Sequence, residues 1–195
     1  MSAITRTWIS FAAIGTGLIH GALVIGAPLG LGIPLAILGV VEFGWGVLAF
    51  TRDTLPAPRA AMVVAVAPLI VWGLLVAAAS TLQSPALASV MDVVPWGVAA
   101  IFQLFVASIL SLHARRVREG RPAARTVPGA ARYLTALMVG GLVVSALTTP
   151  ALAATEAGSY AQPHGEHDGS FTPQRDAPDG DNVDDLFTIP GHNGH

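Results

Sequence analysis

Histidines near the C-terminus give this chain its clearest chemical signal. The chain has six histidines, and four of them form two His-x-x-His pairs. With two acidic neighbours, the candidate site comprises His164, His167, His192, His195, Glu166 and Asp168. Because imidazole nitrogens suit divalent transition ions, the pattern predicts a site for Zn²⁺ or Cu²⁺. The simpler alternative is an acidic, solvated tail in which these histidines only titrate.

Apolar residues interrupt an acidic run between the two histidine pairs. They are Val183, Leu186, Phe187 and Ile189. This pattern is typical of a short motif that orders when it docks on a partner. The surrounding tail, residues 154–195, is rich in Gly, Pro, Asp and His. Because such a composition buries too little apolar surface to offset the entropy of ordering, we expect the tail to be disordered.

Two ionisable residues, His20 and Glu42, lie deep within apolar stretches. Each shares a helical face with glycines, which allow helices to approach closely. Counted from the short turn between the two stretches, their depths differ by roughly 4–5 Å at the rise of an α-helix. We therefore expect a hydrogen bond or ion pair between them. It would serve as a proton relay or ion site, since histidine titrates near physiological pH, or as a structural link between helices.

Several function classes find no support in the sequence. The chain has no cysteine, which excludes disulfides, thiolate metal sites and iron–sulfur ligation. It carries neither a glycine-rich phosphate loop nor a G-x-S-x-G motif, and Glu42 has no second carboxylate at its depth for acid–base work. His20 lies toward the outer side of the membrane and His113 at the inner end of the fourth stretch, so no haem is expected between them. We expect a protein that is not an enzyme.

The elements that carry these residues are apolar helices. A bilayer core about 30 Å thick requires roughly 20 apolar helical residues, and only 11% of the chain is charged. Five segments qualify, namely residues 8–27, 32–50, 60–80, 90–112 and 133–153. The predicted fold is an all-α integral membrane bundle over residues 1–153 with five spans in the lipid bilayer. Trp8, Trp45 and Trp96 lie near predicted span ends, as interfacial anchors do.

The arginines predict the orientation of the bundle. All ten basic residues are arginine, and nine of them lie on one predicted side. Because excess arginine marks cytoplasmic loops, we expect the N-terminus inside and the acidic tail outside. The chain has arginine but no lysine, and it is rich in Ala, Gly, Val and Pro. This composition is typical of a GC-rich bacterial genome, so we expect the membrane to be a bacterial plasma membrane. No aromatic residues interleave with the charge, so nucleic-acid binding is not expected.

Three functions remain open. The first is a non-enzymatic accessory protein that binds a divalent transition metal through its tail. The second is a structural or assembly subunit that contacts other subunits of a larger membrane complex. The third is a small proton or ion carrier that uses His20 and Glu42. A separate possibility is cleavage after Ala153, where small residues match a signal-peptidase pattern.

Overall fold

The computed structural model describes residues 1–83, 93–120 and 129–160. These residues form helices and no strands, so the described chain is all-α. The helices are α1 (Ala3–Ala22), α2 (Leu29–Thr51), α3 (Pro58–Leu82), α5 (Val93–Arg118), α6 (Ala130–Ala153) and the short α7 (Glu156–Ser159). Four of them, α2, α3, α5 and α6, are long and apolar enough to cross a membrane. The chain therefore has the character of a multi-pass membrane protein.

Helix α1 differs from the first span predicted over residues 8–27. It begins earlier, because the Ser2 hydroxyl accepts a hydrogen bond from the Thr5 backbone N–H at 3.2 Å and caps the helix. It ends earlier too, at Ala22, and the following turn reaches a positive φ of 85° at Gly26. Arg6 and several hydroxyl residues lie within its 20-residue length, and α1 is not among the four helices that are long and apolar enough to cross a membrane.

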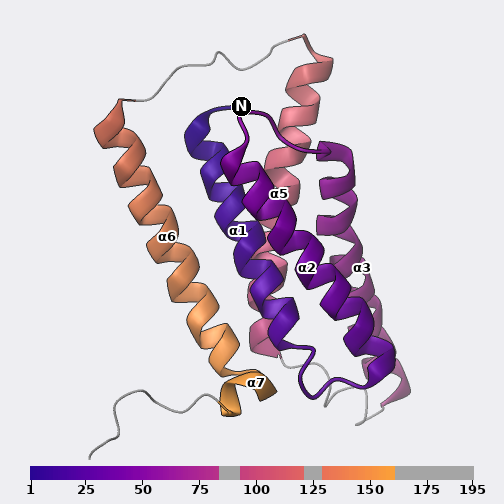
Figure 1. The fold of residues 1–195 in the computed structure, drawn as a ribbon. Helices are drawn as coiled ribbons and strands as arrows, with labels where there is room; N and C mark the ends of the chain where they lie inside the picture. The colour runs from indigo at the N-terminus through magenta and orange to yellow at the C-terminus, as the bar shows by residue number, and fades with distance from the viewer. Residues whose placement is uncertain (84–92, 121–128, 161–195) are drawn as a thin grey trace, which may run out of the picture. The chain divides into compact units, whose positions relative to one another are not determined.

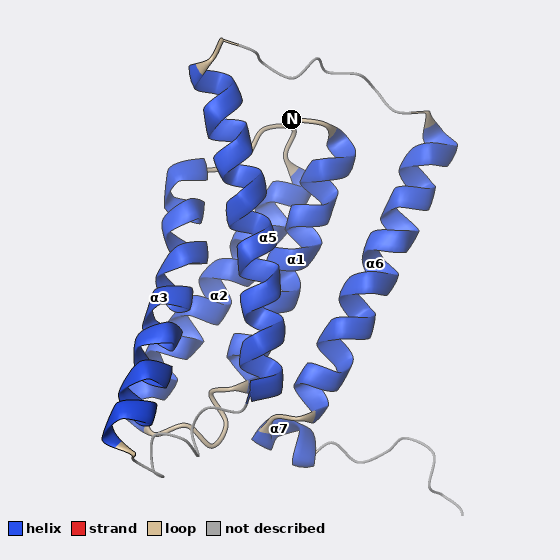
Figure 2. Cartoon of the chain, turned by 180° about the vertical axis from the view of Figure 1, so that it is seen from behind, coloured by secondary structure: helices blue, strands red, loops and turns tan. Residues whose placement is uncertain are grey.

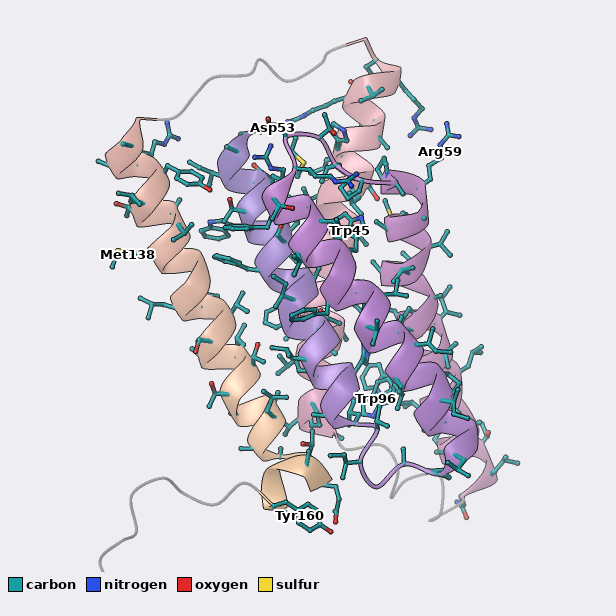
Figure 3. The ribbon with its side chains drawn as sticks, in the orientation of Figure 1. Trp45, Asp53, Arg59, Trp96, Met138 and Tyr160 are labelled. Carbon is teal, nitrogen blue, oxygen red and sulfur yellow. The ribbon has the colours of Figure 1, made fainter. Side chains whose placement is uncertain are left out.

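Helix α1 packs against α2, α5 and α6, while α3 packs against α5 and α2. Figure 1 and Figure 2 show the long helices alternating in direction, with the N-terminus and the α2–α3 connection at the same end. The Arg6 guanidinium ties these two segments together by donating to the Asp53 carbonyl oxygen at 2.9 Å. Asp53 and Arg59 lie at that end in Figure 3, whereas Trp96 lies toward the opposite one.

Glycines bring α1 and α2 into close contact. A Cβ atom on Gly39 would lie 2.9 Å from the Gly17 carbonyl oxygen, and one on Gly46 would lie 2.9 Å from the Ser10 carbonyl oxygen. Small residues permit this approach between membrane helices. The consequence is that side chains on these two helix faces meet across a short gap, and His20 and Glu42 are among them.

The tryptophans predicted as interfacial anchors also make contacts within the bundle. The Trp8 indole N–H donates to the Ala136 carbonyl oxygen at 3.0 Å, and that of Trp45 donates to the Pro56 carbonyl oxygen at 2.7 Å. Trp96 is only 6% exposed. These side chains are partnered or buried within the helical bundle, because neighbouring helices offer them contacts that a count along one span cannot show.

Candidate functional site

His20 and Glu42 form a buried pair between α1 and α2. His20 lies in the last turn of α1, and the glycine contacts described above hold α2 against it. Their side chains meet with His20 Nδ1 2.5 Å from Glu42 Oε2. His20 is 0% exposed and Glu42 is 5% exposed. The structure thus brings together the two ionisable residues that the sequence places at similar depth.

A third residue, Gln103 of α5, completes the site. Its side-chain Nε2 donates to Glu42 Oε1 at 2.9 Å, and Gln103 is only 4% exposed. Each oxygen of the Glu42 carboxylate therefore has a hydrogen-bond partner from a different helix. We call His20, Glu42 and Gln103 the intramembrane cluster. The sequence shows Gln103 as a deep polar residue, but nothing in it fixes which helix faces Glu42, because α5 is far from α2 along the chain.

The second ring nitrogen of His20, Nε2, is buried and has no hydrogen-bond partner in the described part of the chain. The neighbouring ring is Trp96, whose centroid lies 5.8 Å from that of His20 in an edge-on arrangement. An unsatisfied buried polar group costs about 1–3 kcal/mol. The pair is therefore not a fully satisfied polar link between helices.

A cavity of about 80 Å³ lies beside Glu42, which forms part of its wall. Its polar lining comes from Glu42, Gln103 and Thr16, and Trp45 also lines it. The remaining wall is aliphatic and comes from four helices: Ala13, Val41, Ala60, Ala61, Val64, Ala65 and Val106. A carboxylate that faces a small, mostly apolar space is placed to bind a proton or a small cation.

Comparison with protein-family models, curated proteins and solved structures finds no match for this chain. Function is therefore inferred from the chemistry of the intramembrane cluster.

Among the buried polar residues that the structure describes, only His20 and Glu42 are ionisable, and both belong to the cluster. The buried hydroxyls of α1 are engaged within their own helix. Thr7, Ser10 and Thr16 donate to backbone carbonyls four residues earlier, at 3.1, 2.8 and 2.8 Å respectively. Charge within the bundle is therefore concentrated on one pair, His20 and Glu42.

The remaining predicted sites lie outside the described residues. This holds for the six candidate metal ligands, for the four apolar residues of the docking motif and for most of the predicted disordered tail. Within the described ranges, no group of three or more His, Asp or Glu residues is arranged to hold a metal ion. The metal and docking hypotheses thus rest on the sequence pattern.

Proposed function

We propose that this protein is a small multi-pass membrane carrier whose intramembrane cluster binds and exchanges a proton. The single observation that supports this function is the buried His20–Glu42 pair at 2.5 Å, with Gln103 on the second carboxylate oxygen. Ionisable residues within membrane spans are costly and mark ion pathways and proton relays. Histidine and carboxylate together can hold a proton in more than one position.

The unsatisfied atoms of the cluster favour exchange over a purely structural role. A neutral amide or hydroxyl pair would join α1 and α2 without the cost of ionisable groups in hydrocarbon. Instead, His20 Nε2 is unpartnered in the described structure, and Glu42 lines a cavity. An unpartnered ring nitrogen on one side of the hydrogen bond and a carboxylate beside a cavity on the other are what a pair that takes up and releases protons requires.

The sequence supports a specific topology for this carrier. We place five helices across a bacterial plasma membrane, α1 included, with the arginine-bearing end in the cytoplasm. The start of the predicted disordered tail differs in the structure, because Thr155 caps the short helix α7. The tail from residue 161 onward would then lie outside the cell. The arginine distribution and the contact between Arg6 and the α2–α3 connection support this arrangement.

Proton flux into proteoliposomes tests the function. Under an imposed potential, the wild type is expected to acidify the lumen, while Glu42→Gln should lower the rate at least tenfold because the amide cannot titrate. The matched control is Glu119→Gln, which makes the same change on a partly exposed side chain at the end of α5 and should keep the wild-type rate. A Glu42→Gln protein that is folded and conducts protons normally would overturn the proposal.

A second candidate function comes from the two His-x-x-His pairs of the tail. We propose that they capture a divalent transition metal, Zn²⁺ or Cu²⁺, outside the membrane. Calorimetric titration of the full-length protein in detergent provides the test. Micromolar binding that disappears when all four tail histidines are changed to alanine would support metal capture. Millimolar binding, or binding that persists in the quadruple variant, would exclude it.

A further inference from the structure

We propose that the cavity beside Glu42 binds a small ammonium-type cation, and that this cation and the proton of the His20–Glu42 pair exclude one another. This inference rests on the proposed proton-exchange function and names a second ion for the same site. It follows from three properties of the cavity: its hydrogen-bonding groups, its size and its charge.

The polar groups of the cavity offer acceptors. Gln103 lines the cavity and donates from Nε2 to Glu42, and its carbonyl oxygen can act only as an acceptor. Thr16 uses its hydroxyl proton on the Ala12 carbonyl oxygen, which leaves the oxygen lone pairs. The carboxylate of Glu42 accepts one hydrogen bond on each oxygen and has further lone pairs on both. The indole N–H of Trp45 is taken by Pro56. A ligand that suits this site must therefore bring donors.

The volume of the cavity and the number of protein groups that could bind a cation limit which class of cation fits. Its volume of about 80 Å³ corresponds to about two or three water molecules at about 30 Å³ each. Ca²⁺ and Mg²⁺ require six or more oxygens, and three protein groups with the few waters that this cavity could hold beside an ion do not supply them. A primary ammonium group has three N–H donors, matching the three acceptor groups Glu42, Gln103 and Thr16. The aliphatic wall accommodates a short alkyl group such as methyl.

Charge makes cation and proton competitors. A lone carboxylate in an apolar interior is strongly disfavoured, so Glu42 needs one compensating positive charge. A proton on the His20–Glu42 pair supplies that charge when the cavity holds no cation. When an ammonium cation occupies the cavity, the proton leaves to water and neutral His20 donates its Nδ1 hydrogen to Glu42. One cation enters for each proton released, so the net charge of the site is unchanged.

Other ionisable groups on the surrounding helices lie away from the cluster. On α1 and α3 they are Arg6 and Arg59, and Arg59 points away from the bundle in Figure 3. On α5 and α6 they lie near the arginine-bearing ends and are partly or largely exposed: His113, Arg115, Arg116, Arg118, Arg132 and Tyr133. Glu42 and His20 are therefore the groups whose protonation a cation in the cavity changes directly.

Proton release on cation binding tests the inference. Wild-type protein in nanodiscs, in weakly buffered solution with a pH dye, is titrated with methylammonium chloride. We expect saturable release approaching one proton per chain. Tetramethylammonium has the same charge and no N–H donor, so it should release none. Glu42→Gln should abolish the release, whereas Glu119→Gln should retain it.

Two variants examine the cavity itself. Ala65→Leu fills space in the wall, and Thr16→Val removes one acceptor at nearly constant volume. We expect Ala65→Leu to abolish the release and Thr16→Val to weaken methylammonium binding at least fivefold. Helical circular dichroism and a single gel-filtration peak establish that each variant is folded. Wild-type release by methylammonium in a folded Ala65→Leu variant would contradict a site in this cavity.

The remaining outcomes separate this inference from the proposed function. The fluorescence of Trp96, isolated by comparison with Trp96→Phe, reports the protonation of the adjacent His20 ring. If that signal titrates with pH but methylammonium releases no proton, the cation site is wrong and proton exchange stands. If neither occurs and proteoliposomes show no proton flux, both proposals fail. Equal release by Na⁺ or tetramethylammonium would overturn the assignment of an ammonium-type ligand.

Discussion

Gly39 of α2 lies so close to Gly17 of α1 that a Cβ atom on Gly39 would be 2.9 Å from the Gly17 carbonyl oxygen. Backbone, and not a flexible side chain, occupies that space. The contact holds the two helices at the separation at which His20 and Glu42 meet. The geometry of the intramembrane cluster therefore depends on residues that have no functional groups.

Gly39→Ala is expected to destabilise the bundle by about 1–3 kcal/mol, because the added methyl group forces α1 and α2 apart. Gly44→Ala is the matched control, since a Cβ atom there meets nothing within 4 Å in the same helix. Alanine also favours the helix over glycine, so this control should be neutral or slightly stabilising. Thermal unfolding in detergent measures both. Equal Tm values for the two variants would show that the close contact does not limit packing.

The second prediction concerns the cost of separating the buried pair. Glu42→Leu leaves His20 Nδ1 and Gln103 Nε2 without their acceptor, and His20→Leu leaves a buried carboxylate with Gln103 as its remaining donor. Each single variant should unfold more readily than the wild type by about 3–5 kcal/mol. The double variant should be more stable than either single one, because both ionisable groups are then gone and only Gln103 Nε2 lacks its acceptor.

Chemical unfolding of the four proteins gives the coupling energy. A double variant destabilised by the sum of the two single effects would indicate that the two residues act independently. That result would also remove the structural basis for a shared proton.

The sequence is informative about the helices and about one pair of residues. Long apolar stretches predict α2, α3, α5 and α6, because apolar length alone decides which helices can span a membrane. A short turn makes α1 and α2 neighbours, so depth counting places His20 beside Glu42. Other features depend on how separate helices pack. The contact from Gln103, the cavity and the burial of Trp96 all involve α5 or α3, whose placement beside Glu42 no local spacing fixes.

The third prediction tests the topology and whether α1 crosses the membrane. The chain has no cysteine, so single cysteines report sidedness without background. Suitable positions are Ser2 before α1, Thr54 between α2 and α3, and Ser159 in α7. With five crossings and the N-terminus inside, Ser2→Cys and Thr54→Cys should react with a membrane-impermeant maleimide only after permeabilisation. Ser159→Cys should react in intact cells.

The pattern of labelling separates the alternatives. If α1 does not cross, only α2 lies between positions 2 and 54 as a span, so Ser2→Cys and Thr54→Cys would label on opposite sides. That outcome matters for mechanism, because His20 lies in the last turn of α1. A crossing α1 puts His20 close to the outer face, with the cavity of Glu42 extending along α3 toward Ala60 and the arginine-bearing end. The hydrogen-bonded pair would then lie between the outer face and a cavity that extends toward the arginine-bearing side, as transfer of a proton across the membrane requires.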